Sequence, residues 1–365
     1  QPSGARIFQS VFWNVAYYDR FYFESLFGEF RFPDGSRPDW ESLSWLQKRF
    51  MKWFNAERTK TVLTFPVETM ALLTENGECR DEEWGDFTAE MYAEGHSFFT
   101  YMSDNADSLS SCCRLRNEIQ DNGFSYTLGA GGVSTGSKSV LTINLNRCVQ
   151  YAVKRGLSYM DYLADIIDTV HKVQVAYNEN LKYLNDKGML PLFSAGYINI
   201  KRQYLTIGVN GLVESAEFLG IEITDNDNYA KYVQDVLGLI EDFNHKYRPK
   251  DVMFNCEMIP AENVGVKHAK WDREDGYQVN RDCYNSYFYI VEDTTLNVVD
   301  RIRLHGERYI THLTGGSALH LNLEEHLSKA QYRQILRIAA KEGCNYFTFN
   351  IPNTRCNDCG HIDKR

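Results

Sequence analysis

Two adjacent cysteines are the first residues in this sequence that suggest chemistry. The stretch "SLSSCCRLRN" covers residues 108–117 and places Cys112 and Cys113 directly before Arg114. Adjacent cysteines are strained as a disulfide and awkward as metal ligands, whereas a guanidinium beside a thiol favours the reactive thiolate. Three interpretations remain: a core thiol beside a loop thiol, a nucleophile, or a redox or radical thiol.

A second cysteine pattern lies further along the sequence. Cys356 and Cys359 form a Cys-x-x-Cys motif, and His361 follows it. Thiolates at this spacing can share one tetrahedral zinc ion, but a structural site needs four ligands. We therefore expect half of a structural zinc site here, with two ordinary surface thiols as the plain alternative. A redox motif of this type usually opens a helix after a strand, which this one does not.

Glycines and polar side chains follow several of the expected strands. "CEMIPAEN" places Glu257 and Glu262 around a proline, where a carboxylate could act as a base or hold hydroxyls. "TGGSALH" could bring backbone N–H groups of Gly315, Gly316 and Ser317 to a phosphate. Solvated loop charge and a tight turn are the plain interpretations. "GAGGVSTGSK" is not a phosphate loop, because it lacks the P-loop spacing and precedes a strand.

Composition limits the class of protein. The chain has 365 residues, 43% of them hydrophobic and 24% charged, which is typical of a soluble globular protein. A net charge of −10 without a basic run argues against a nucleic-acid binder. No apolar run reaches the roughly 20 residues of a membrane span, and no signal peptide is evident. Nine cysteines, an odd number in a long chain, indicate a reducing, cytoplasmic location.

Strands and helices are expected to alternate along the chain, which indicates an α/β protein with a largely parallel sheet. In such folds, sites are built where the strands end. Strands are expected in "SVLTINL", "YLTIGVN", "VMFNCEM" and "CNYFTFN", and also before Pro66, where a helical turn should follow. Helices are expected over residues 39–57, 82–102, 147–187, 227–246 and about 329–342.

Taken together, several stretches resemble the class III anaerobic ribonucleoside-triphosphate reductases, which are glycyl-radical enzymes. The matching segments keep the family's order from one end of the chain to the other. They are "FQSVFWN", "HSFFTYMSDNADSLSSCCRLRN", "TGSKSVLTINLNR", "LTIGVNGLVE", "CEMIPAEN", "TGGSALHLNLEEHL" and "YFTFNIPNTRCNDCGHIDK".

The resemblance implies a ten-stranded α/β barrel, incomplete here, with a finger loop through its centre. Residues 1–350 would form the partial barrel, and residues 351–365 would begin a truncated zinc-binding segment. The family's radical cysteine is followed directly by arginine, which implies that Cys113 has this role. As a thiyl radical it would take the 3′ hydrogen of the nucleotide, the 2′ hydroxyl would leave as water, and Cys113 would return the hydrogen.

Further roles follow from the same resemblance. Glu257 is implied as a second catalytic residue, and Cys356 and Cys359 as zinc ligands. The reductant would be formate or a thiol donor, since the family's asparagine near the reductant is absent around Gly136 and Ser137, and Cys112 replaces a glycine. The implied substrate-binding residues are Ser137, Asn144, Pro260, Ala261, Glu262, Gly315, Gly316 and Ser317.

The resemblance also implies partners. These are a ribonucleoside triphosphate substrate, dNTP and ATP effectors, a radical-SAM iron–sulfur activase and a second copy of the intact chain, with no membrane or nucleic acid. The radical glycine would lie on a missing C-terminal segment, so we expect the 365 residues alone to be inactive. Two alternatives stay open: another glycyl-radical enzyme of the formate-lyase type, and a non-catalytic zinc-ribbon binding module.

Overall fold

The computed structural model divides the chain into two compact units. The first unit comprises Gln1–Cys113, Glu118–Ala130 and Ala318–Arg365, and the second comprises Arg114–Asn117 and Gly131–Ser317. The described residues are 14–61, 63, 65–106, 108–110, 116–118, 136–248, 252–259, 262–351 and 353–364.

The first unit is built on one mixed sheet with the strand order β1, β2, β4, β11 and β10, and a short β3 pairs with β2. Neighbouring strands are parallel except for two antiparallel pairs, β4 with β11 and β2 with β3. Among the described strands this sheet does not close on itself. The bounds are β1 (Asn14–Tyr18), β2 (Val67–Glu75), β3 (Glu78–Cys79), β4 (Phe99–Ser103), β10 (Leu319–Asn322) and β11 (Tyr346–Asn350).

Local signals define the main helices of this unit. Asp39 caps the helix that follows it, accepting a hydrogen bond from the Ser42 N–H at 2.8 Å. Ser328 and Gln331 form a capping box at the start of the last helix, which ends at Gly343. The predictions for 39–57 and 329–342 are confirmed. The helices are α1 (Arg20–Phe27), α2 (Trp40–Arg58), α3 (Glu82–Ala93) and α12 (Lys329–Glu342).

Two sequence predictions in this unit were wrong. The residues after Pro66 form strand β2 and not a helical turn, because this stretch runs through the interior with Thr69 to Leu73 buried on both faces. Residues 82–102 are not one helix, since α3 ends at Ala93 and β4 begins at Phe99.

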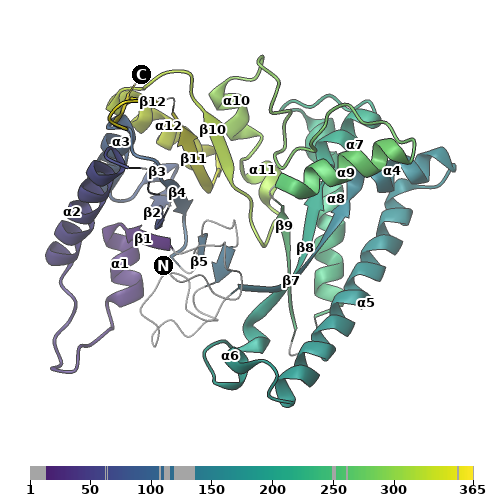
Figure 1. The fold of residues 1–365 in the computed structure, drawn as a ribbon, viewed down its shortest axis with the longest axis horizontal. Coiled ribbons are helices and arrows are strands. Elements are labelled where there is room, and N and C mark those ends of the chain that lie inside the picture. The colour runs from purple at the N-terminus through teal and green to yellow at the C-terminus, as the bar shows by residue number, and fades with distance from the viewer. Residues whose placement is uncertain are drawn as a thin grey trace. The chain divides into compact units, whose positions relative to one another are not determined.

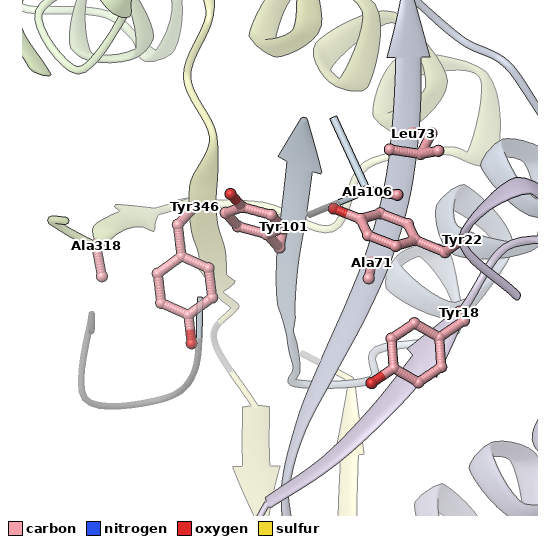
Figure 2. Close-up of a cluster of buried hydrophobic side chains, with 8 residues drawn as sticks. All are labelled: Tyr18, Tyr22, Ala71, Leu73, Tyr101, Ala106, Ala318 and Tyr346. Carbon is pink, nitrogen blue, oxygen red and sulfur yellow. The ribbon is translucent and has the colours of Figure 1, made fainter. Parts of the chain in front are cut away.

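Tyrosines form much of the core of the first unit. Figure 2 shows rings from β1, α1, β4 and β11 gathered with aliphatic side chains of β2. The Tyr18 and Tyr22 ring centroids lie 6.0 Å apart, and Phe99 stacks on Tyr346 at 4.8 Å. Alanines such as Ala71 occupy the space that these rings leave. Strands from both ends of the sequence are therefore held together by aromatic packing.

Glu68 on β2 is a fully buried carboxylate. It accepts a hydrogen bond from the Tyr17 hydroxyl, and its Oε2 lies 3.0 Å from Arg58 Nη1 at the end of α2. Arg58 also donates to the Ser97 carbonyl at 2.7 Å. Burial raises the pKa of Glu68 to about 7, although Arg58 and Tyr17 oppose the rise. The cluster joins β1, β2 and α2 through one titratable group.

The free energy of unfolding should therefore fall as pH rises from about 5 to about 7. An unfolded glutamate has a pKa of about 4.3, so in this window the folded chain keeps a proton that the unfolded chain has lost. Glu68 should contribute a slope of up to about 1.4 kcal/mol per pH unit. Denaturant titrations at several pH values measure it. Glu68→Gln should flatten the dependence of the unfolding free energy on pH, whereas Glu75→Gln, at the exposed end of β2, should not. If the unfolding free energies of Glu68→Gln and wild type changed with pH in parallel, the assignment to Glu68 would be contradicted.

The second unit contains a three-stranded parallel sheet, and helices connect its strands (Figure 1). The strands are β7 (Gly136–Asn144), β8 (Gln203–Asn210) and β9 (Met253–Met258). The larger helices are α4 (Leu145–Lys154), α5 (Tyr159–Asp186), α7 (Leu212–Phe218), α8 (Asp227–Lys246) and α9 (Glu262–Glu274). Shorter elements are α6 (Pro191–Ser194), η3 (Ile200–Arg202), α10 (Val298–Arg303) and α11 (Glu307–Ile310).

One face of this sheet is apolar and is covered by α5 and α8. Leu205, Ile207 and Cys256 on this face are completely buried. The ring of Phe254 lies 4.8 Å from the ring of His171 on α5. The opposite face therefore receives the alternate side chains of the same strands.

Most helix and strand predictions for this unit are confirmed, and α8 has the predicted bounds of 227–246. The region 147–187 is two helices and not one, since the left-handed Gly156 follows α4 and Ser158 caps α5. None of the helices in the described part of the chain is both long and apolar enough to span a bilayer.

The sequence therefore predicts the mixed α/β class correctly. Whether the strands belong to a ten-stranded barrel with a central finger loop stays a proposal.

Candidate active site

Polar side chains gather on the face of the β7–β8–β9 sheet that lies opposite α5 and α8. The strand register aligns Thr206 with Asn255, and Thr142 and Glu257 with Gly208 between them. Because neighbouring strands pleat together, these side chains share one face. We call this set the polar face; its residues are Ser137, Thr142, Thr206, Asn255 and Glu257.

A β-bulge brings Ser137 into the polar face. The register of β7 against β8 shifts between Ser137 and Ser139. As a result, the Ser137 hydroxyl lies 2.8 Å from the Thr206 hydroxyl. Bulges reorient side chains in this way and are frequent beside functional sites. The predicted substrate-binding residue Ser137 thus shares a face with the predicted catalytic residue Glu257.

The segment 314–317 lies along the free side of β9. The Gly315 N–H donates to the Cys256 carbonyl at 2.7 Å, and the Met258 N–H donates to the Gly316 carbonyl at 3.2 Å. The Gly316 N–H donates to the Leu313 carbonyl at 3.0 Å. Two of the N–H groups expected to bind a phosphate therefore serve the internal structure, and the phosphate role of this turn stays a prediction.

Asn255 and Ser317 have unused hydrogen-bonding capacity. Asn255 is fully buried and Ser317 is 2% exposed. Within the described residues, neither the Asn255 amide nor the Ser317 hydroxyl has a hydrogen-bond partner. Buried polar groups are nearly always paired, so these groups can accept a partner that the described chain does not supply. Sequence reasoning missed Asn255 and Thr206, which only the alternation along the strands could have indicated.

Asn144, a predicted substrate-binding residue, uses its whole amide for structural contacts. Its Nδ2 donates to both carboxylate oxygens of Asp272 at 3.0 Å. Its Oδ1 accepts from the Arg147 N–H at 3.0 Å and so caps α4. The residue lies at the carboxyl end of β7, where it fixes neighbouring elements.

Several predicted site residues lie outside the described residues. These are Cys113 with its neighbours Cys112 and Arg114, and also Pro260 and Ala261. Strands β5 (Ser108–Ser110) and β6 (Arg116–Glu118) flank the cysteine pair along the chain. Glu262 is the first residue of α9, and the position of its side chain is not described. The roles of these residues stay predictions.

Cys356 and Cys359 lie in an exposed hairpin between β12 (Asn353–Arg355) and β13 (Ile362–Lys364). The Cys356 N–H donates to the His361 carbonyl at 2.8 Å. The backbone N–H of Cys359 is the main cause of a lowered pKa of the Cys356 thiol, which favours the thiolate that a metal needs. The pair fits two corners of a zinc site, although the described residues contain no group of three or more potential ligands.

Replacing Gly315 with alanine should disrupt the edge of the site. A Cβ there would lie 2.7 Å from the Cys256 carbonyl oxygen and 3.0 Å from the Asn255 amide nitrogen. Since the first contact is with backbone, we expect the free energy of unfolding to fall by about 1–3 kcal/mol, as measured by denaturant titration.

Gly238→Ala provides the matched control. Its Cβ would meet nothing closer than His312 at 3.5 Å, and alanine favours helix α8 by up to about 1 kcal/mol. Equal stability of the Gly315→Ala and Gly238→Ala proteins would contradict the packing of residues 314–317 on β9.

Comparison with protein families gives one match over the whole chain. A family model described as anaerobic ribonucleoside-triphosphate reductase matches residues 1–365. A comparison with curated protein sequences found no match.

Solved structures of bacterial reductases resemble this chain closely. The anaerobic ribonucleotide reductase of Thermotoga maritima with glycerol in the active site is 29% identical with a TM-score of 0.86, and the match covers 100% of this chain and 61% of that one. The same enzyme in complex with dATP and CTP is 30% identical with a TM-score of 0.82, covering 98% and 59%. This chain therefore spans about three fifths of the length of the structures it matches.

Proposed function

Because this chain belongs to the anaerobic ribonucleoside-triphosphate reductase family, we propose that it contributes to the reduction of ribonucleoside triphosphates to 2′-deoxyribonucleoside triphosphates. The observation that carries the proposal is the family match over all 365 residues. The match also argues against the two alternatives, a formate-lyase relative and a zinc-ribbon binding module.

The proposed chemistry centres on Cys113. As a thiyl radical, its sulfur takes the 3′ hydrogen atom of the ribose, so an S–H bond forms and a C–H bond breaks. The 2′ hydroxyl then leaves as water with an added proton. A reductant, formate or a thiol donor, supplies two electrons, and Cys113 returns the hydrogen atom to the 3′ carbon. The family's glycyl radical supplies the unpaired electron that creates the thiyl.

The polar face supports a role in holding the sugar. Glu257 can accept a proton or bind a ribose hydroxyl. The Asn255 amide offers both a donor and an acceptor, and Ser137 and Ser317 contribute hydroxyls. The Thermotoga relative has been solved with glycerol in its active site, and glycerol, like ribose, is a polyol. We assign binding of the nucleotide itself to the residues Pro260–Glu262, where α9 begins. The Gly315–Ser317 turn is assigned to the same substrate.

Several further features belong to the proposal. They include the ten-stranded barrel with its finger loop, a zinc ion held in part by Cys356 and Cys359, and a cytoplasmic location. The relative was solved with dATP in a specificity site, and we extend nucleotide effectors to this protein. An iron–sulfur activase of the radical-SAM type and a second copy of the chain complete the proposed partners.

The test is ribonucleotide reduction by the anaerobically activated full-length protein, with CTP as substrate. Cys113→Ser should abolish deoxynucleotide formation, by at least about 10⁴-fold, because an alcohol O–H cannot replace the thiol as the hydrogen carrier. Cys112→Ser is the matched control and should keep turnover within about tenfold of wild type.

Electron paramagnetic resonance serves as the second readout. The activated wild-type protein should give a glycyl-radical signal, and Cys113→Ser should keep it. Loss of turnover in both variants would contradict the assignment of the radical role to Cys113 alone. A wild-type protein that gives neither a radical signal nor product would overturn the proposed function.

A further inference from the structure

Helix α9 is attached to the second unit mainly through polar contacts. Its buried positions are Gly265, Ala269 and Asp272, which share one helix face. Its large apolar side chains point outward, since Val266 is 48% exposed and Trp271 is 50% exposed. Amphipathic helices usually bury an apolar stripe. Because α9 exposes these side chains, hydrogen bonds must contribute more to holding it in place.

Asp272 makes the largest number of these polar contacts. Its carboxylate is completely buried. It accepts hydrogen bonds from Arg147 Nε at 2.6 Å, from the Tyr284 hydroxyl at 2.6 Å and from Asn146 Nδ2 at 3.2 Å. Asn144 Nδ2 donates to both oxygens at 3.0 Å. A buried carboxylate with several donors is strongly held, because removal of the charge would leave those donors unpaired.

His268 makes the second attachment, one helical turn closer to the start of α9. Its Nδ1 lies 2.9 Å from Asn210 Oδ1, so the ring donates through Nδ1 in the neutral form. Burial lowers the pKa of His268, which keeps that form at neutral pH. A backbone bond from the Tyr284 N–H to the Gly265 carbonyl at 3.3 Å adds a third contact on this helix face.

The two side-chain partners have a common place in the fold. Asn144 is the last residue of β7, and Asn210 is the last residue of β8. α9 itself begins at Glu262, a few residues after β9 ends at Met258. The helix is thus tied through directional hydrogen bonds to the carboxyl ends of β7 and β8, the other two strands of the sheet to which β9 belongs.

We propose that Asp272 and His268 are positioning residues that set the start of α9 and thereby the affinity for the nucleotide triphosphate. The inference rests on the proposed function, which assigns nucleotide binding to the residues where α9 begins. Ten residues separate Glu262 from Asp272, about 15 Å along a helix. A tilt of the helix by about 10° at Asp272 would move Glu262 by about 2–3 Å. Displacements of about 1 Å already impair the positioning of a bound substrate.

The matched pair of variants is Asp272→Asn and Asp275→Asn in the full-length protein. Asn is isosteric, but its amide N–H groups would face the donors of Arg147 and Asn144. Asp275 pairs with the same arginine, Arg147 Nη2 at 2.7 Å, but is 57% exposed. Asp272→Asn should raise the KM for CTP at least about tenfold and change kcat less than about threefold, whereas Asp275→Asn should change KM less than about twofold.

A purely structural role would lower the melting temperature of Asp272→Asn and leave the KM of the folded protein unchanged, and that result overturns the inference. The same holds if kcat falls while KM stays constant. His268→Ala removes a single bond of a half-buried side chain, so it carries the same test if Asp272→Asn does not fold, with an expected KM increase of about threefold to tenfold. A wild type that reduces no CTP would overturn the proposed function itself, whereas an active wild type with an unchanged Asp272→Asn overturns only this inference.

Discussion

Three paired parallel strands impose an alternation of side chains that the rest of the second unit follows. Successive side chains of β7, β8 and β9 point to opposite faces. One set, including Ile207 and Cys256, is buried under α5 and α8. The other set forms the polar face, with Glu257 beside the Thr314–Ser317 segment. A shift of one residue in a single strand would move the side chains of that strand to the opposite face, so the β8–β9 pairing determines which side chains of β9 join the polar face.

The carboxyl ends of β7 and β8 hold helix α9 through side-chain hydrogen bonds. Asn144 and Asn210 end β7 and β8, and each bonds a side chain of α9. Glycine contributes where space is short: Gly211, with a φ of 79°, turns the chain from β8 into α7 beside Asn146. Polar amides thus replace apolar packing at the place where a parallel sheet normally builds its site.

Sequence reasoning succeeded where the signal was local. Helices α2, α8 and α12 combine a periodic apolar stripe with a capping residue, and their bounds were predicted to within a residue or so. α9 was not predicted, because its buried face of Gly265, Ala269 and Asp272 lacks that stripe. The partnership of Asn144 with Asp272 spans 128 residues, and no local pattern reveals it.

The family resemblance was visible in short ordered motifs before any geometry was known, and the whole-chain match bears it out. Spacing alone could not separate the residues that face a substrate from those that hold the scaffold. Glu257 and Ser137 share the polar face, whereas Asn144 is fully engaged with Asp272 and α4.

The polar attachment of α9 has a thermodynamic consequence. Release of this helix would expose mainly Gly265, Ala269 and hydrogen-bonding groups, so little apolar surface would become hydrated. The heat-capacity change of that local opening should be small, as should its dependence on urea. The free energy of that opening should therefore change almost linearly with temperature. The free energy of opening the tyrosine-rich core in the first unit should instead follow a curve. Within one chain, the helix beside the candidate site and the aromatic core would respond to different solvent conditions.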